Sequence, residues 1–345
     1  MNFSYKWNLE DLKEVNPNGL KVFSCFSGSG GSTMGYKMAG YNTVGALEID
    51  KEMLETYVSN LKPKLPILDS IQNFKKRSSF PEELLNLDIL DGSPPCSVFS
   101  ESGHKDKKWG AEFKFREGQT KQRLDNLFFD FIDLAEKLKP KMIVAENVRG
   151  MIKGKTKGFT KAIIKAFKDI GYNIQLFNLN GADMGLPQKR VRVFFIASRA
   201  ELGLPKLKLN FKEPFVCFRE IRNDNDGGKE LTPYMLNYWK SKLPNEIEFH
   251  SITTRLKGKR SLFNYSMVKD NAVLRTIMAN GGDPNIILYD RPRYINFKEI
   301  TLASSFPSDY KFKNNRHGIY CMGMSVPPLM IYKISREIAL QCFNV

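Results

Sequence analysis

Cys96 is the residue whose type and position most directly suggest chemistry. It stands immediately after two prolines in the stretch DGSPPCSVFS, at the end of a short apolar run that reads as a buried strand. Free cysteines are more often inert core residues than nucleophiles. The position favours a nucleophile in this chain, because ligands bind beyond the carboxyl ends of strands in α/β sheets and the prolines stiffen the approach to the thiol.

Polar side chains that could work with this thiol lie at the ends of two further apolar runs. Glu146 and Asn147 end the run KMIVAENV, whereas Gln188, Arg190 and Arg192 lie at the start of QKRVRVFFIAS. If these ends meet at one edge of a sheet, a thiolate, a carboxylic acid and two guanidinium groups share one cleft.

A glycine-rich turn near the N-terminus predicts a ligand beside these groups. Residues 21–50 read as a strand, a turn with Gly28, Gly30 and Gly31, a helix, and a second strand that ends at Glu48. Such a turn approaches a ligand closely, and an acid about 20 residues on can hold a ribose hydroxyl. The segment suits an adenosine-containing cofactor, although the same glycines could serve packing alone. Thr33 stands where a dinucleotide fingerprint has its third glycine, which disfavours NAD.

Alternating runs of two kinds must position these residues. Short runs rich in β-branched and aromatic residues predict strands, and longer runs with apolar residues every three to four positions predict helices. This alternation favours a parallel, doubly wound α/β sheet. The predicted strands are 20–26, 43–49, 87–93, 141–148, 174–180 and 191–198, and the clearest predicted helices are 127–139 and 159–172.

The alternation ends near Glu201. The residues that follow contain the loop signals RNDNDGGKE and ANGGDPN and no clean βα repeat. We therefore predict a second, smaller and irregular domain.

Composition limits the classes of function. The chain has 345 residues, of which 42% are hydrophobic, enough for a substantial core. Its 53 Lys and Arg residues against 37 Asp and Glu residues give a net charge of +16, which favours a polyanionic partner such as nucleic acid. Neither a bilayer-spanning run nor an export signal is present, so we expect no membrane contact. The five widely spaced cysteines contain no CxxC pair, and we expect a reducing compartment and no metal.

Taken together, the motifs resemble those of the cytosine-5 DNA methyltransferases, which use S-adenosylmethionine. The resemblance covers most of the chain outside residues 205–285. Two further stretches, LFF at 127–129 and RYINFKEITLASSFPSDY at 293–310, are similar to family motifs. The ordered motifs that carry the resemblance are FSGSGG at 26–31, PPC at 94–96, ENV at 146–148, QKRVR at 188–192 and GMSVPP at 323–328.

The resemblance implies a Rossmann-like methyltransferase sheet with helices on both faces, together with a smaller, irregular target-recognition domain. Residues 1–203 with 316–345 would form the catalytic domain, and 204–315 the target-recognition domain and hinge. It also implies double-stranded DNA as the partner of a monomeric, cytoplasmic, bacterial or phage-encoded enzyme that acts in restriction-modification or self-marking.

The same resemblance implies catalytic roles. Cys96 would add to carbon 6 of a flipped-out cytosine, and Glu146 would hydrogen-bond ring nitrogen 3. Arg192 would hold the pyrimidine carbonyl or a phosphate, while Arg190 would order the carboxylate and the thiol.

Residues for cofactor and nucleic acid follow from the matching motifs and the basic segments. Ser70, Ser97, Met324 and Lys298 depart from the usual family residues. The expected cofactor pocket comprises Phe26, Ser27, Gly28, Ser29, Gly30, Gly31, Glu48, Ile49, Ser70, Ile71, Pro95, Leu127, Met324, Ser325 and Val326. The expected nucleic-acid contacts are Ser97, Trp109, Arg255, Lys257, Lys259, Arg260 and Arg275.

Two alternatives compete with this interpretation. One is a tRNA cytosine-5 methyltransferase from a related branch, which the long segment between 198 and 293 disfavours because it leaves space for a target-recognition domain. The other is a catalytically silent nucleic-acid-binding relative, which would have no need to keep Cys96, Glu146, Arg190 and Arg192 together.

Overall fold

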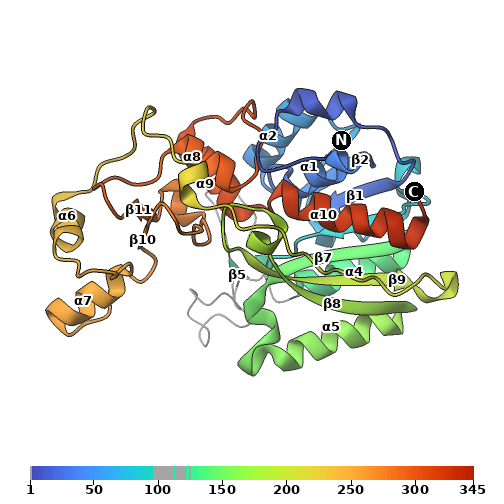
Figure 1. Ribbon diagram of the computed structural model, residues 1–345. Coiled ribbons are helices and arrows are strands. Elements are labelled where there is room, and N and C mark those ends of the chain that lie inside the picture. The colour runs from blue at the N-terminus through green and yellow to red at the C-terminus, as the bar shows by residue number, and fades with distance from the viewer. Residues whose placement is uncertain (1, 96–111, 114–121, 124–125) are drawn as a thin grey trace.

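The computed structural model describes residues 2–95, 112–113, 122–123 and 126–345. Its centre is a seven-stranded sheet in the order β3-β2-β1-β4-β7-β9-β8 (Figure 1). The strands of this sheet are β1 Lys21–Cys25, β2 Asn42–Glu48, β3 Leu65–Leu68, β4 Ile89–Gly92, β7 Met142–Val148, β8 Tyr172–Asn180 and β9 Val191–Arg199. All six predicted strands are present, and β3 was not predicted.

The prediction of a wholly parallel sheet is wrong at one strand. The pairings among β3, β2, β1, β4 and β7 are parallel, but β9 runs antiparallel to both β7 and β8. The start of β9 therefore lies at the same edge as the carboxyl ends of β1, β4 and β7. In register, Val148 at the end of β7 stands opposite Arg192 near the start of β9.

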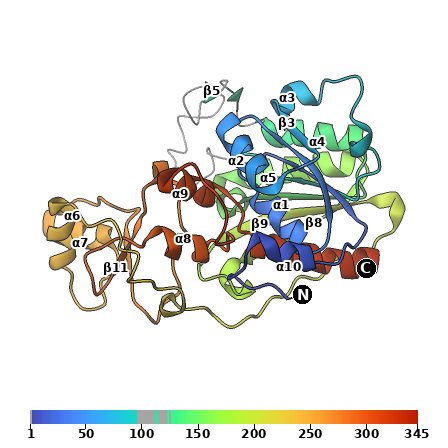
Figure 2. The ribbon, with the colours of Figure 1, turned by 90° about the horizontal axis from the view of Figure 1, so that it is seen from above.

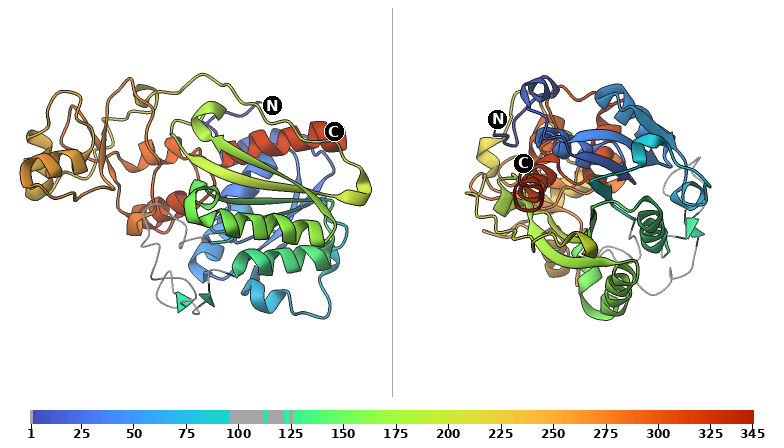
Figure 3. Two further views of the ribbon diagram at one scale, coloured as in Figure 1. Left: turned by 90° about the horizontal axis from the view of Figure 1, so that it is seen from below. Right: turned by 90° about the vertical axis from the view of Figure 1, so that its right-hand side faces the viewer.

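Helices cover both faces of this sheet, as Figure 3 shows for α10 on one side and α4 and α5 on the other. Successive residues along a strand point to opposite faces of the sheet and belong to two separate hydrophobic cores. In β7, for example, Met142 and Val144 belong to one core, and Ile143 and Ala145 belong to the other. The first core packs against α1 Gly31–Met38, α2 Lys51–Leu61 and α10 Pro328–Ile338. The second packs against α3 Ile71–Phe74, α4 Leu127–Leu138 and α5 Lys157–Asp169.

A smaller module projects from one end of the sheet, and in Figure 2 it lies far from both termini. Its own hydrophobic cluster includes Met235, Phe249, Ile252 and Ile287. Its elements are α6 Pro233–Lys240, α7 Phe249–Lys257 and the parallel pair β10 Ser266–Val268 and β11 Ile286–Leu288. Between this module and the sheet lie α8 Phe297–Ala303 and α9 Asn315–Met324, and a short hairpin pairs β5 Glu112–Phe113 with β6 Gln122–Arg123.

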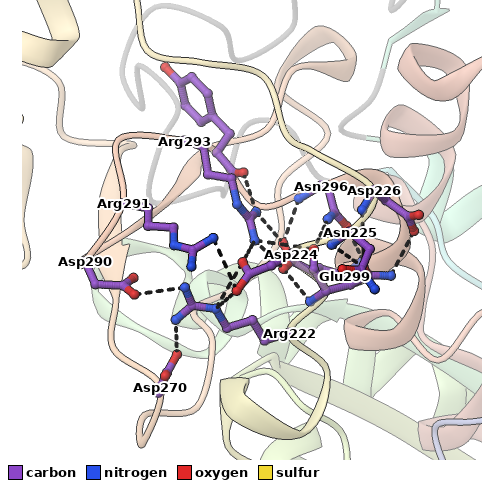
Figure 4. Close-up of polar contacts among 12 residues, drawn as sticks. Arg222, Asp224, Asn225, Asp226, Asp270, Asp290, Arg291, Arg293, Asn296 and Glu299 are labelled. Atoms are coloured by element: carbon purple, nitrogen blue, oxygen red, sulfur yellow. Dashed lines mark hydrogen bonds and ion pairs between the residues drawn. The ribbon is translucent and has the colours of Figure 1, made fainter.

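The ends of the module are fixed by a network of ion pairs (Figure 4). Arg293 contacts Asp224 at 2.8 Å and Glu299 at 2.9 Å, and the Glu299 side chain is fully buried. Arg222 contacts Asp224, Asp270 and Asp290. Because these residues come from three separate segments, the network holds the loop before α6, the loop after β10 and the start of α8 together.

Among the described residues, no helix is long and apolar enough to cross a membrane. The same part of the chain contains no group of three or more His, Cys, Asp or Glu side chains arranged to hold a metal ion.

Arg293→Met should lower the free energy of unfolding by about 3–5 kcal/mol, because it leaves the buried carboxylate of Glu299 without its counter-ion. Urea unfolding followed by tryptophan fluorescence measures this. Lys298→Met is the control: its side chain is 61% exposed, lies 3.7 Å from Asp226, and should cost less than about 1 kcal/mol. Equal effects of the two substitutions would contradict the role given to the network.

Candidate active site

A cavity of about 420 Å³ opens at the edge of the sheet where β1, β2, β4 and β7 end and β9 begins. The wall brings together short segments that are far apart in the sequence. These segments are 26–32, 48–53, 93–95, 146–148, 190–192, 276–279 and 320–326.

The glycine-rich turn forms the part of the wall nearest to β1. Phe26, Gly28 and Gly30 have positive φ angles of 54°, 52° and 89°, so the chain reverses sharply between β1 and α1. A Cβ atom on Gly31 would lie 2.3 Å from the carbonyl oxygen of Val326, so only glycine permits this close approach. A Cβ atom on Gly28 would meet no atom within 4 Å, which leaves the backbone of the turn open toward the cavity.

Glu48, at the end of β2, is held against this turn. Its Oε2 accepts a hydrogen bond from the N–H of Gly28 at 2.7 Å, and its Oε1 accepts from Ile49 at 2.8 Å and Asp50 at 2.9 Å. Burial raises the pKa of Glu48, and these backbone donors partly offset the effect. The carboxyl group is thus fixed in the cavity wall, at the position predicted for ribose recognition.

The structure brings most of the predicted cofactor residues to this cavity. Phe26, Ser27, Gly28, Gly31, Glu48, Ile49, Pro95, Met324, Ser325 and Val326 line it. Ser29, Gly30, Ser70, Ile71 and Leu127 are not part of the wall.

These five residues have other surroundings. A Cβ atom on Gly30 would lie 2.6 Å from the Tyr57 and Leu61 side chains, away from the cavity. Ser70 caps α3 by accepting from the N–H of Asn73 at 3.1 Å. Ser29, Ile71 and Leu127 are buried, the last two in the core beneath α3 and α4.

An ion pair between Glu146 and Arg192 stands in the same cavity. Arg192 Nε lies 2.8 Å from Glu146 Oε1, and the two side chains are only 14% and 12% exposed. Burial lowers the pKa of Arg192, and the neighbouring Glu146 opposes this effect. The antiparallel pairing of β7 with β9 places the carboxyl group and the guanidinium side by side.

Arg190 contacts backbone carbonyl groups beside the cavity. It is 2% exposed and donates to the carbonyl oxygens of Ile277 at 3.1 Å, Gly323 at 3.1 Å and Ser325 at 2.6 Å. Arg192 is the arginine that contacts the carboxyl group of Glu146 directly. The predicted role of Arg190 in ordering that carboxylate and the thiol stays a prediction, because Cys96 lies outside the described residues. Burial also lowers the pKa of Arg190 well below its usual value.

Asn147 fixes the approach to the predicted nucleophile. Its Nδ2 donates to the carbonyl oxygen of Pro94 at 3.1 Å, and its Oδ1 accepts from the N–H of Val148 at 2.8 Å. Pro94 and Pro95, the last described residues before Cys96, line the cavity. Cys96, Ser97 and Trp109 lie outside the described residues.

One part of the wall, residues 276–279, was not predicted from the sequence. Thr276 Oγ1 donates to the carbonyl oxygen of Lys189 at 2.6 Å, and the N–H of Ile277 donates to Gln188 Oε1 at 3.1 Å. A Cβ atom on Gly323 would lie 2.3 Å from the backbone nitrogen of Ala279, so this segment also packs tightly on α9.

A second, wider cleft of about 990 Å³ adjoins the cavity and separates the start of β9 from the small module. Val148, Arg192, Thr276 and Met278 line both spaces. Phe263, which is 55% exposed, lies on its wall. The basic residues that line the cleft are Arg149, Lys153, Lys189, Arg192, Arg260, Lys269 and Arg275.

Only some of the predicted nucleic-acid residues reach this cleft. Arg260 and Arg275 line it, and Arg275 also contacts Glu248. Arg255 contacts Glu246 at 2.7 Å and the carbonyl oxygen of Ser241 instead. Lys257 lies over the rings of Tyr234 and Tyr238, and Lys259 is exposed outside the cleft wall.

Comparisons with known proteins agree with this geometry. The family model of the C-5 cytosine-specific DNA methylases matches residues 20–340. Type II methyltransferase M.FnuDI of Fusobacterium nucleatum is 35% identical over 345 residues, which cover 92% of this chain and 94% of that protein. Type II methyltransferase M.NgoPII of Neisseria gonorrhoeae is 34% identical over 196 residues, which cover 57% of this chain and 53% of that protein.

Two solved structures share the fold. A protein from E. coli, described as a DNA modification methyltransferase encoded within a prophage, has a TM-score of 0.67 at 20% identity, covering 95% of this chain and 100% of that one. Spodoptera frugiperda DNMT2 has a TM-score of 0.66 at 17% identity, covering 93% of this chain and 99% of that one.

Proposed function

The chain belongs to the C-5 cytosine-specific DNA methylase family and is a DNA cytosine methyltransferase. We propose that it uses S-adenosylmethionine as the cofactor and methylates carbon 5 of one flipped-out cytosine within a specific double-stranded DNA site. The family assignment favours DNA over the tRNA alternative. We further propose that the enzyme acts as a monomer in a bacterial cytoplasm, as the modification activity of a restriction-modification system.

The position of the two spaces side by side carries this proposal. The small cavity is lined by Glu48 and by the Glu146–Arg192 pair, and it shares Arg192 and Thr276 with the wider basic cleft. A base that leaves a duplex in the cleft would enter the adjoining cavity. The basic side chains of the cleft suit the phosphates of the duplex.

The residues present fit S-adenosylmethionine. The open backbone at Gly28 and the two oxygens of Glu48 suit a ribose, and Gly31, Ser325 and Val326 form the adjoining wall. When bound, this cofactor supplies an electrophilic methyl group at the site where cytosine is to be modified.

The chain's own groups would make carbon 5 of cytosine reactive. Cys96, as a thiolate, would form a bond to carbon 6, and the ring electrons would move toward carbon 5. The O–H of protonated Glu146 would donate a hydrogen bond to ring nitrogen 3, and Arg192 would stabilise the carboxylate once that proton moves to the ring. Loss of the carbon 5 proton to solvent and departure of the Cys96 thiolate would restore the aromatic ring, and the proton on ring nitrogen 3 would return to Glu146.

The side chains of the small module are proposed to select the site, in keeping with the predicted role of residues 204–315. Arg260, Phe263 and Asn264 line the cleft opposite Arg149 and Lys189, so one wall would contact bases and the other phosphates.

Cys96→Ser should retain cofactor binding and lose methyl transfer, because a hydroxyl is a much weaker nucleophile at neutral pH than a thiol with thiolate character. A duplex containing 5-fluorocytosine should trap the wild type covalently, detected by denaturing electrophoresis and peptide mass spectrometry. Cys217→Ser, a half-buried cysteine of the small module, is the control and should be trapped like the wild type. Normal turnover by Cys96→Ser, or an adduct on another cysteine, would exclude Cys96 as the nucleophile.

Glu48→Gln should weaken S-adenosylmethionine binding by about 1.5–3 kcal/mol, because a charge-assisted hydrogen bond to the ribose is lost. Titration calorimetry measures the affinity, and DNA binding should stay unchanged. Glu55→Gln, an exposed position on α2, serves as the control and should bind as the wild type does. An unaltered cofactor affinity for Glu48→Gln would remove Glu48 from the pocket.

Lys189→Ala should weaken binding to all duplex sequences alike and reduce the slope of log affinity against log salt by about 1, because one phosphate contact is lost. Arg255→Ala should leave that slope unchanged, since Arg255 is engaged with Glu246 away from the cleft. Fluorescence anisotropy across a salt series distinguishes the two. The reverse ranking would mean that DNA does not occupy the cleft.

A further inference from the structure

Asp91 is a buried carboxyl group directly behind the wall of the small cavity. It is 3% exposed and lies on β4, opposite Ser24 of β1 and Val144 of β7. Ser93, two residues further along the chain, lines the cavity. The steps proposed above for methyl transfer make no use of this acid.

Hydroxyl groups surround the carboxyl group of Asp91. Tyr36 of α1 donates to Oδ1 at 3.3 Å, and the hydroxyls of Ser24 and Ser32 also form hydrogen bonds with it. Ser32 is itself part of the cavity wall. The side chain of Ser32 therefore lies between the carboxyl group of Asp91 and the small cavity.

The titratable groups around Asp91 come from every element that packs against it. They are Tyr36 of α1, Tyr57 of α2, Cys25 of β1 and Glu146 of β7. None of these side chains can become a cation, so within the described chain they offer Asp91 no counter-ion. Burial, with a smaller contribution from Glu146, raises the pKa of Asp91 to about 7, although the hydrogen bonds from Ser24, Tyr36 and Ser32 oppose the rise.

A buried acid without a cation is stabilised in its ionised form by a cationic ligand nearby. S-adenosylmethionine carries such a charge on its sulfonium, whereas the product S-adenosylhomocysteine has a neutral thioether at the same atom. We propose that Asp91 is a positioning residue whose negative charge, behind Ser32, favours binding of the sulfonium cofactor over its thioether product. This inference rests on the proposed use of S-adenosylmethionine.

The expected pH dependence follows from the sign of the charge. Below about pH 7 the carboxyl group of Asp91 is mostly protonated and neutral, so sulfonium binding must release its proton to solvent. The affinity for S-adenosylmethionine should therefore rise as the pH increases through 7. Each unit by which the bound cofactor lowers the pKa of Asp91 corresponds to a tenfold gain in affinity. We expect the bound sulfonium to lower this pKa by about one unit, which gives a gain of about tenfold. The thioether product should show no such gain.

Titration calorimetry of both ligands between pH 5.5 and 8.0, in two buffers of different ionisation enthalpy, tests the proposal. In the wild type, S-adenosylmethionine should bind about tenfold more tightly at the upper pH and release more protons than S-adenosylhomocysteine does. The sulfonium also lowers the pKa of the α-amino group in S-adenosylmethionine relative to the thioether product, so proton release from this group is measured with Asp91→Asn and subtracted. Asp91→Asn, which keeps the size of the side chain, should abolish the remaining difference between the ligands in both affinity and proton release.

Tyr36→Phe provides a second, independent variant. It removes a hydrogen bond that lowers the pKa of Asp91, so the midpoint of the pH dependence should move to higher pH while the preference for the sulfonium remains. Equal pH profiles for the two ligands in the wild type, or an unchanged difference in folded Asp91→Asn, would overturn the role of Asp91. Failure of the wild type to bind either ligand would instead refute the cofactor assignment itself. If Asp91→Asn does not fold, the wild-type comparison and the Tyr36→Phe midpoint still decide the question.

Discussion

The position of the candidate active site depends on the direction of one strand. β9 runs antiparallel to β7, so its first residues lie at the edge where the parallel strands end. Had β9 been parallel, Arg192 would have been near the opposite ends of the strands, away from Glu146. The reversal places the guanidinium of Arg192 beside the acid of the cavity. The same strand brings Arg190 to a position from which it can reach two other loops.

Arg190 shows how a buried cation determines the packing around it. A guanidinium has five N–H donors, and leaving them unpaired in a protein interior is costly. Arg190 satisfies its terminal nitrogens with carbonyl oxygens from residues 277, 323 and 325. The loop before α10 and the segment that follows β10 must therefore both close over the start of β9. Two regions widely separated in the sequence thus become neighbouring parts of the cavity wall.

Local sequence patterns predicted the elements that carry the chemistry but not the contacts between distant segments. The six predicted strands and the turn at Gly28 follow from alternation and glycine spacing, which are local signals. β3 was missed because its sequence LPIL contains a proline, which is compatible with its position at the edge of the sheet. The segment 276–279 has no periodicity, and hydrogen bonds with residues 188–190, nearly ninety positions away, help to place it at the cavity. The contact between Arg192 and Glu146 likewise depends on strand direction, which composition does not encode.

The basic residues illustrate the same limit for electrostatics. A net charge of +16 indicates a polyanionic partner, but it does not identify the Lys and Arg side chains that contact that partner. Arg255 and Arg222 are neutralised by carboxylates inside the small module, where they contribute to its structure. Lys189 and Arg260, by contrast, line the cleft beside the cavity. Because paired cations are compensated within the protein, the field that a duplex experiences comes mainly from those left facing the cleft. The density of lysine and arginine along the chain is therefore a poor guide to the binding surface, and the tertiary partner of each side chain is a better one.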